Sequence, residues 1–167
     1  MMLSVALHSL CVLKKLKGRK SDSPPWKALP IAVTVKEVME RNVPAIGSDQ
    51  VVSQAIEKMI QAGVWSLLVE RRGLPVGVVT DRDILRRCAA MGHYPDRVKV
   101  EQIMSSPIIT IEPNARAGEA LKTMVEKNVR RLYVVEGGKI IGRVTQTGLS
   151  RNLLGVMSAL ASIPYEV

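Results

Sequence analysis

The sequence predicts an α+β fold in which one β-α-β-β-α unit occurs twice in tandem. The first observation is an internal repeat, since shifting the 167-residue chain by 65 positions aligns residues 35–86 with its second half without a gap. The second is the spacing of apolar residues, which changes between that of a helix and that of short strands. The third is size: one copy is too small for a secure core, so we expect two copies to pack sheet to sheet with pseudo-two-fold symmetry.

The first copy is expected to contain all five elements of this unit. Val52 and Met59 belong to a run of apolar residues at helical spacing, and Gly63 ends that helix. A tight turn at 71–73 joins two apolar, β-branched strands. The expected elements are a helical turn at 35–39, an extended segment at 43–46, a helix at 51–62, strands at 64–69 and 74–79, and a helix at 81–91 that Gly92 ends.

The second copy is expected to repeat this order after a link at 92–99. Its elements are a turn at 101–104, an extended segment at 108–111, a helix at 117–127, strands at 131–135 and 139–144, and a helix at 147–162. The positions that match between the copies are mainly apolar residues and turn glycines, for example Met39 with Met104 and Gly77 with Gly142. Core positions and turns are what two copies of one small fold would share.

Residues 1–30 are expected to form a basic extension before the two copies, which span 31–94 and 95–167. Leu3, Leu7 and Leu10 would share one face of a short amphipathic helix, followed by a Lys/Arg cluster and a Pro-rich linker. The favoured interpretation is that this helix packs on the body or on a partner chain. The alternatives are contact of residues 1–20 with an anionic membrane surface and an extension with little structure. The apolar run is too short to span a bilayer, which needs about 20 residues.

The net charge indicates what kind of ligand to expect, and the spacing of the cysteines indicates the cellular compartment. The net charge of +9 is uneven, because residues 1–30 carry +5 and the other 137 residues carry +4. That mild excess on the folded part suits an anionic small ligand or simply solubility, and it is not the dense basic stripe that would favour nucleic acid. The two cysteines have neither metal-type nor disulfide spacing, which indicates free thiols in the cytoplasm. His8 and His93 have no neighbouring ligand in the sequence, so no metal site and no catalytic base are expected.

The segment 77–84, Gly-Val-Val-Thr-Asp-Arg-Asp-Ile, is the centre of the first copy. A short buried strand leads directly into a helix, with Thr80 at the N-cap and Asp83 three residues later. One interpretation is a capping box that only starts the helix. The other is a hydroxyl and a carboxylate presented to a ligand at a helix N-terminus. The second copy retains Thr145 but has Gly148 in place of the carboxylate, which indicates that capping is not its only use.

The repeat resembles the CBS domain, and the pair resembles a Bateman module. The resemblance covers about residues 33–162. The resemblance rests on four segments of the sequence. They are Val-Lys-Glu-Val-Met at 35–39, the segment 77–84, Val-Arg-Arg-Leu-Tyr-Val-Val at 129–135 and Gly-Arg-Val-Thr-Gln-Thr-Gly-Leu at 142–149. The resemblance implies a non-catalytic regulatory module that binds an adenosine-containing ligand, such as AMP, ADP, ATP or S-adenosylmethionine. AMP, ADP or ATP is favoured over the sulfonium compound, because arginines suit phosphate. The resemblance also implies a homodimer that regulates an attached or partner protein.

The resemblance further implies one ligand site between the copies. Its residues are Thr80, Asp83, Ile108, Ile109, Arg130 and Arg131. The carboxylate would accept hydrogen bonds from both ribose hydroxyls, because it has two acceptor oxygens, and the threonine would bond to the ribose or the α-phosphate. The isoleucines would lie against the adenine. The arginines, Arg131 above all, would bind the phosphate through their fixed fork of donors.

The equivalent second site departs from this pattern. Its residues would be Val43, Pro44, Trp65, Ser66 and Thr145. It lacks the ribose carboxylate, which Gly148 replaces, and it has Trp65 and Ser66 where the first site has its arginines. We expect this site to be empty or weak, with stacking of a ligand on Trp65 as the alternative.

Three functions are compared on these grounds. The favoured one is a ligand-sensing regulatory module without a catalytic cofactor, whose regulated partner is a separate chain. The alternatives are a nucleic-acid binder, for which the pI of about 9.9 and the basic clusters argue, and a purely structural dimerisation module. Aromatic residues make up only 3% of the chain, which leaves few stacking platforms for nucleic acid. An enzyme is not expected, because the sequence shows no nucleophile and base pair and no paired carboxylates suited to acid–base work.

Overall fold

The computed structural model describes residues 33–161. The expected N-terminal helix, its linker and residue 162 lie outside this range. None of the helices between residues 33 and 161 has the length and apolar character that crossing a membrane requires. The same part of the chain contains no group of three or more His, Cys, Asp and Glu side chains placed to hold a metal ion.

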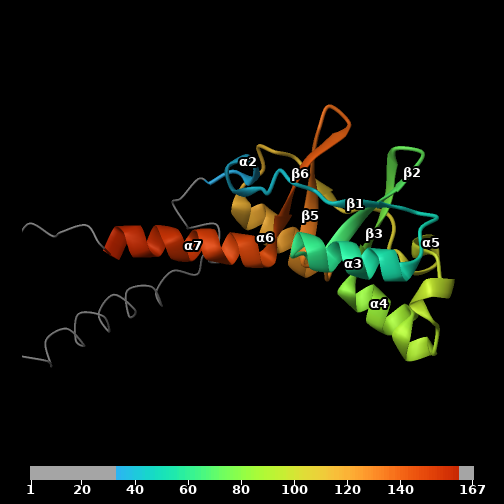
Figure 1. Cartoon of the computed structure of the whole chain (residues 1–167). Helices are drawn as coiled ribbons and strands as arrows, with labels where there is room; N and C mark the ends of the chain where they lie inside the picture. The colour runs from blue at the N-terminus through green and yellow to red at the C-terminus, as the bar shows by residue number, and fades with distance from the viewer. Residues whose placement is uncertain (1–32, 162–167) are drawn as a thin grey trace, which may run out of the picture. The chain divides into compact units, whose positions relative to one another are not determined.

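Both copies have the predicted β-α-β-β-α order (Figure 1). The first contains β1 (Ala45–Gly47), α3 (Val52–Ala62), β2 (Ser66–Arg71), β3 (Leu74–Thr80) and α4 (Asp81–Arg87). The second contains β4 (Thr110–Ile111), α6 (Ala117–Glu126), β5 (Arg131–Glu136), β6 (Lys139–Thr145) and α7 (Gln146–Ala161). Short helices α2 (Val35–Val38) and α5 (Val100–Ile103) precede the two copies, and the 3-10 turns η2 (Ala89–Met91) and η3 (Pro95–Arg97) connect them.

Each copy forms a three-stranded sheet of the same topology. A parallel pair, β1 with β2 or β4 with β5, is followed by an antiparallel hairpin, β2 with β3 or β5 with β6. The two hairpin turns also match. Arg72 and Gly73 have φ angles of 52° and 75°, and Gly137 and Gly138 have φ angles of 57° and 76°. Two left-handed residues in succession fit the right-handed twist of the flanking strands.

The helix expected at 81–91 is shorter than predicted, because α4 ends at Arg87. The chain turns inward at Cys88, whose side chain is fully buried and whose thiol donates to the carbonyl of His93 at 3.5 Å. The 3-10 turn η2 follows, and Gly92 closes it with a φ of 70°. A core residue therefore ends this helix about one turn early.

Strands β1, β2 and β4 each begin two residues later than predicted. Val64 shows the reason for β2. Its backbone N–H donates to the carbonyl of Met59 at 2.9 Å and so closes the end of α3 instead of pairing in the sheet. Val129 donates to Met124 in the same way before β5. The prediction placed Val64 in the strand because it is apolar, whereas its backbone ends the preceding helix.

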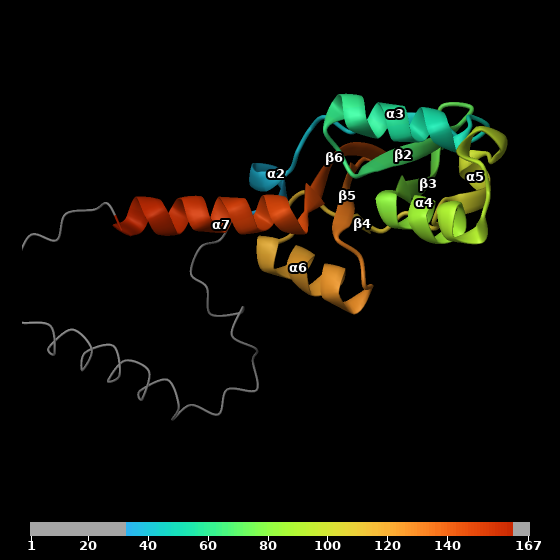
Figure 2. The same ribbon diagram turned by 60° about the horizontal axis from the view of Figure 1, so that its bottom comes forward.

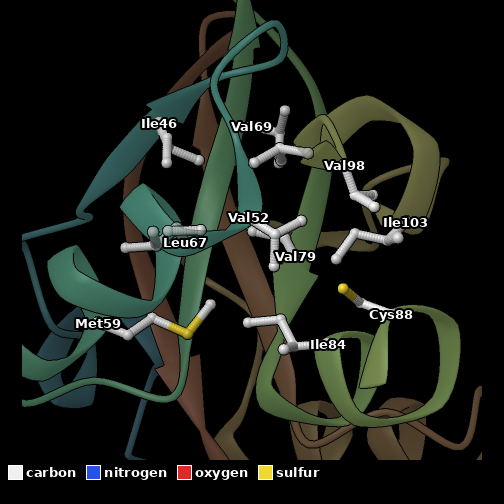
Figure 3. Close-up of a cluster of buried hydrophobic side chains, with 12 residues drawn as sticks. Ile46, Val52, Met59, Leu67, Val69, Val79, Ile84, Cys88, Val98 and Ile103 are labelled. Carbon is white, nitrogen blue, oxygen red and sulfur yellow. The ribbon is translucent and has the colours of Figure 1, made fainter. Parts of the chain in front are cut away.

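The two copies exchange their opening segments. Val98, Val100 and Ile103, which precede β4, lie in the hydrophobic core of the first copy (Figure 3). Val35 and Met39, which precede β1, lie in the core of the second copy. Each copy therefore completes its core with side chains that come before the other copy in the sequence.

Gly77 allows one of these segments to cross β3 closely. A Cβ at this position would lie 2.8 Å from the sulfur of Met104 and 2.9 Å from the backbone oxygen of Ser105. Gly142 repeats the arrangement on β6, where a Cβ would lie 2.8 Å from the sulfur and 3.0 Å from the backbone oxygen of the equivalent segment, 39–40. Real Cβ atoms do not approach other atoms this closely, so the crossing requires glycine.

The faces of the sheets that point away from the cores are also covered. Leu68 on β2 and Tyr133 on β5 occupy equivalent positions, belong to neither core, and are 4% and 1% exposed. Figure 2 shows the two hairpins lying beside each other, between the helices of the two copies. This is the burial that two sheets packed on each other produce.

Candidate functional site

A cleft of about 170 Å³ lies between the two copies and contains five of the six predicted site residues. These five are Thr80 and Asp83 from the first copy and Ile109, Arg130 and Arg131 from the second. The sixth, Ile108, is half-buried and does not line the cleft. The lining residues that sequence reasoning did not select are Val78, Asp81, Arg82, Ser105, Pro107, Asn128, Val129 and Tyr133.

Thr80 and Asp83 form a complete capping box at the start of α4. The N–H of Asp83 donates to Thr80 Oγ1 at 3.1 Å, and the N–H and hydroxyl of Thr80 donate to Asp83 Oδ2 at 3.0 and 2.7 Å. The capping interpretation of this motif is therefore correct. Helix α7 begins with half of the same arrangement, because the N–H of Gly148 donates to Thr145 Oγ1 at 3.0 Å. A helix can thus start at this place in the unit without the carboxylate.

Asp83 also has contacts that a cap does not need. The residue is only 8% exposed, and its Oδ1 accepts from the hydroxyl of Ser105 at 3.1 Å. Nη1 of Arg87 lies 3.5 Å from the same oxygen. A carboxylate oxygen has two lone pairs, so Oδ1 keeps acceptor capacity toward the cleft. Ser105 lies in the segment that crosses β3 and pairs with Val78, so this segment helps to hold the carboxylate in position.

Arg131 brings positive charge to the same cleft. Its side chain is half-buried. Burial lowers the pKa of the guanidinium, while Tyr133 and the nearby carboxylates of Asp81 and Asp83 partly offset this effect. The guanidinium stays protonated at neutral pH, because it is a strong base. Arg130 is exposed at the edge of the cleft. A carboxylate from one copy and guanidinium groups from the other therefore share one space, which suits a ligand with hydroxyls at one end and an anion at the other.

Tyr133 is a lining residue whose counterpart in the first copy, Leu68, has no polar group. Its hydroxyl is the one buried side-chain polar atom within residues 33–161 that lacks a hydrogen-bond partner. Burial raises the pKa of this hydroxyl, and the charges of Arg131 and Arg143 partly offset the rise. The sequence contained a signal, a tyrosine where the other copy has leucine, but the strand pattern alone did not show that this residue faces the cleft.

An ion pair occupies the place where the second site was predicted. Arg143, which is equivalent to Val78 of the first cleft, has a side chain that is only 9% exposed. Its Nε and Nη2 donate to Oε2 of Glu40 at 2.9 and 2.8 Å. Oε1 of Glu40 would lie 3.6 Å from a Cβ at Gly148, which is the position of the missing carboxylate. Sequence reasoning missed this pair, because its members are 103 residues apart.

The five residues predicted for the second site differ widely in exposure. Ser66 is 2% exposed, whereas Trp65 is 73% exposed. Val43, Pro44 and Thr145 are half-buried. A ring that stands in solvent cannot enclose a ligand between apolar surfaces, so these positions favour an empty or weak second site over stacking on Trp65.

Replacing Glu40 with Ala is expected to lower the free energy of unfolding by about 1–2 kcal/mol, because Arg143 would stay buried without its charged partner. Glu136 provides the matched control. It pairs with Lys36 at 3.3 Å, but both side chains are about half exposed, so Glu136→Ala should change stability by less than about 0.5 kcal/mol. Urea unfolding of the two variants measures the difference. Equal effects would show that the Arg143 pair is no more important than a surface contact.

The family comparison matches the CBS domain twice, at residues 35–90 and 100–155. An uncharacterized protein of Methanopyrus kandleri is 37% identical over 116 residues, which are 68% of this chain and 59% of that protein. The CBS domain-containing protein YhcV of Bacillus subtilis is 29% identical over 136 residues, 80% of this chain and 96% of YhcV. This chain thus spans about three fifths of the first relative and nearly all of the second.

A solved structure shows the same fold. It is the structure of a putative signal-transduction protein with CBS domains from Burkholderia ambifaria, with a TM-score of 0.69 and 27% identity, covering 81% of this chain and 99% of that one. Both matched segments coincide with the two β-α-β-β-α copies described above. The chain belongs to the CBS domain family, and its two copies form a CBS domain pair.

Proposed function

We propose that this CBS domain pair is a non-catalytic regulatory sensor that binds an adenine nucleotide, AMP, ADP or ATP, in the cleft between its two copies. CBS domain pairs are typically regulatory modules. The observation that carries the proposal is that the cleft joins the carboxylate of Asp83 from one copy to the guanidinium of Arg131 from the other. In a nucleotide, the ribose hydroxyls can donate to such a carboxylate, and the phosphate oxygens can accept from such a guanidinium.

Each part of the nucleotide has a partner in this arrangement. The ribose hydroxyls donate to Asp83, where Thr80 and Ser105 already hold the carboxylate in position. The adenine lies against apolar surface that includes Ile109, and the phosphate binds Arg131 with help from Arg130. A ligand that contacts both copies stabilises the conformation in which the two copies lie close together. This change in conformation would transmit ligand binding to the regulated protein.

The proposal includes one nucleotide site per chain, because the Arg143–Glu40 ion pair takes the place of the second. Titration calorimetry of the whole chain with AMP, ADP and ATP tests both parts. We expect saturable binding at a stoichiometry of one, and two sites of equal affinity would contradict the account of the second cleft. We further propose a homodimer that acts on a separate partner protein, and light scattering with and without AMP tests the dimer.

Replacing Arg131 with Gln is expected to weaken AMP binding about tenfold and to leave adenosine binding unchanged, because the substitution removes one charge-assisted bond to phosphate. Arg86→Gln is the matched control, since Arg86 is exposed on α4 and does not line the cleft. Calorimetry of both variants with AMP and adenosine makes the comparison. If Arg131→Gln weakens the two ligands equally, Arg131 supports the cleft but does not bind phosphate.

A further inference from the structure

A second pocket, of about 490 Å³, lies beside the loop that follows α4. The loop residues Gly92, His93, Tyr94 and Arg97 form one wall, and residues of α4 and α5 form others. This pocket shares no lining residue with the cleft between the copies. Its volume is in the range of small-molecule sites, roughly 300–1,000 Å³. It is therefore a separate space that is large enough for an organic ligand.

The charged side chains that line this pocket are cationic. Arg87 and Arg97 supply two guanidinium groups and His93 an imidazole, and no acidic residue is among the lining residues. Within the described part of the chain, Arg97 has no ion pair, and its guanidinium lies 5.6 Å from the centre of the Tyr94 ring. Asp83, which does not line this pocket, lies 3.5 Å from Nη1 of Arg87 and offsets part of its charge, but Arg97 and the remaining donors of Arg87 still favour an anionic ligand.

Arg87 is held in a fixed orientation at the back of this pocket. Its Nη1 donates to the carbonyl oxygens of Ile103 and Met104 at 2.8 and 2.9 Å. These bonds use both hydrogens of Nη1, so three of the five guanidinium donors, on Nε and Nη2, have no partner between residues 33 and 161. Donors that are already oriented lose little freedom when they bind an oxyanion, which is a favourable arrangement for phosphate.

We propose that this pocket binds a phosphomonoester, with its phosphate between Arg87 and Arg97 and its organic part against Tyr94 and Val98. A phosphomonoester carries close to two negative charges at neutral pH, which matches the two guanidinium groups. Inorganic phosphate alone would leave most of a pocket of this volume unfilled. The organic part would then contact apolar surface, because Val98 is buried at the pocket wall and the Tyr94 ring is 70% exposed beside it.

The probe for this proposal is phenyl phosphate, titrated into the isotopically labelled whole chain while the amide resonances are followed by NMR. We expect saturable shifts at Gly92, His93 and Gln102, with a dissociation constant on the order of 1 mM. Phenol should not produce these shifts, because it lacks the phosphate. Arg97→Gln is expected to weaken binding about tenfold, while Arg86→Gln, which removes an equally exposed charge outside the pocket, should not.

Gln102→Glu gives a test that keeps the fold. The Gln102 side-chain oxygen accepts from the N–H of Lys99 at 2.7 Å, and a glutamate would keep this acceptor while it adds a negative charge to the pocket. We expect it to weaken phenyl phosphate binding about tenfold, and Gln61→Glu, exposed at the end of α3, to have no such effect. The proposal does not depend on the nucleotide site, so Arg131→Gln should leave this affinity unchanged. Shifts confined to the cleft residues, or equal effects of Arg97→Gln and Arg86→Gln, would overturn it.

Discussion

Asp83→Ala is expected to weaken AMP binding about 100-fold, because it removes the acceptor for both ribose hydroxyls and each charge-assisted bond contributes about 1.5 kcal/mol or more. The same substitution removes the acceptor for the N–H and hydroxyl of Thr80, so it should also lower the free energy of unfolding by about 1–2 kcal/mol. Calorimetry with AMP measures the first effect, and urea unfolding measures the second.

Asp83→Asn separates these two effects. Its amide oxygen can still accept from the N–H of Thr80, so stability should remain near that of the unmodified chain, while AMP affinity should still fall about tenfold with the loss of the charge. Asp81→Asn is the control, because Asp81 lines the same cleft and its carboxylate accepts a local hydrogen bond, from the N–H of Arg82 at 2.9 Å. We expect it to leave AMP affinity unchanged or to raise it. If Asp83→Asn binds AMP normally, Asp83 acts only as a helix cap.

Gly77→Ala is expected to lower the free energy of unfolding by about 2–4 kcal/mol, which makes it the substitution with the largest effect on stability. The added Cβ would lie 2.9 Å from the backbone oxygen of Ser105, and this oxygen cannot move by itself because it accepts the ladder bond from the N–H of Val78 at 2.9 Å. The flexible Met104 side chain can yield, but the backbone crossing cannot. Urea or thermal unfolding measures the change.

Two further glycines test the reason for this effect. Gly142→Ala should cost a similar amount, because its Cβ would meet the equivalent segment at 2.8 and 3.0 Å. Gly155→Ala, on α7, meets no atom within 4 Å and should stabilise the chain by about 0.5–1 kcal/mol, as alanine does in a helix. A destabilising Gly155→Ala or a neutral Gly77→Ala would show that close approach at the crossing does not determine the outcome.

The sequence predicted the elements of both copies and five of the residues that line the cleft, because these depend on local patterns that occur twice. Val52 and Met59 at helical spacing, and the strand that leads into Thr80, can be recognised without knowing what they contact. The shift of 65 residues then placed Arg131 opposite Ser66 and Gly148 opposite Asp83. Comparing the copies in this way showed which positions had changed chemistry, and the resemblance to a known family gave them roles.

The features that the sequence did not predict depend on contacts between distant residues. Glu40 and Arg143 each look like ordinary surface charges in a local pattern, and only the fold brings them together. Ser105 was not among the predicted site residues, yet its hydroxyl donates to the carboxylate of Asp83. The end of α4 and the start of β2 were misplaced for a related reason. Cys88 and Val64 are apolar, and a pattern of apolar residues does not show where a backbone N–H finds its partner.

Because the opening segments are exchanged, the boundaries of the two copies in the sequence differ from the boundaries of their hydrophobic cores. A fragment that ended before Val98 would lack three core residues of the first copy, and the start of the second copy would expose those residues to water. Such a fragment would have to recruit another chain to complete its core, which is the condition for domain swapping. Contacts such as Val35 to Ala115 must also form across a long loop, so the two halves must fold together as one cooperative unit.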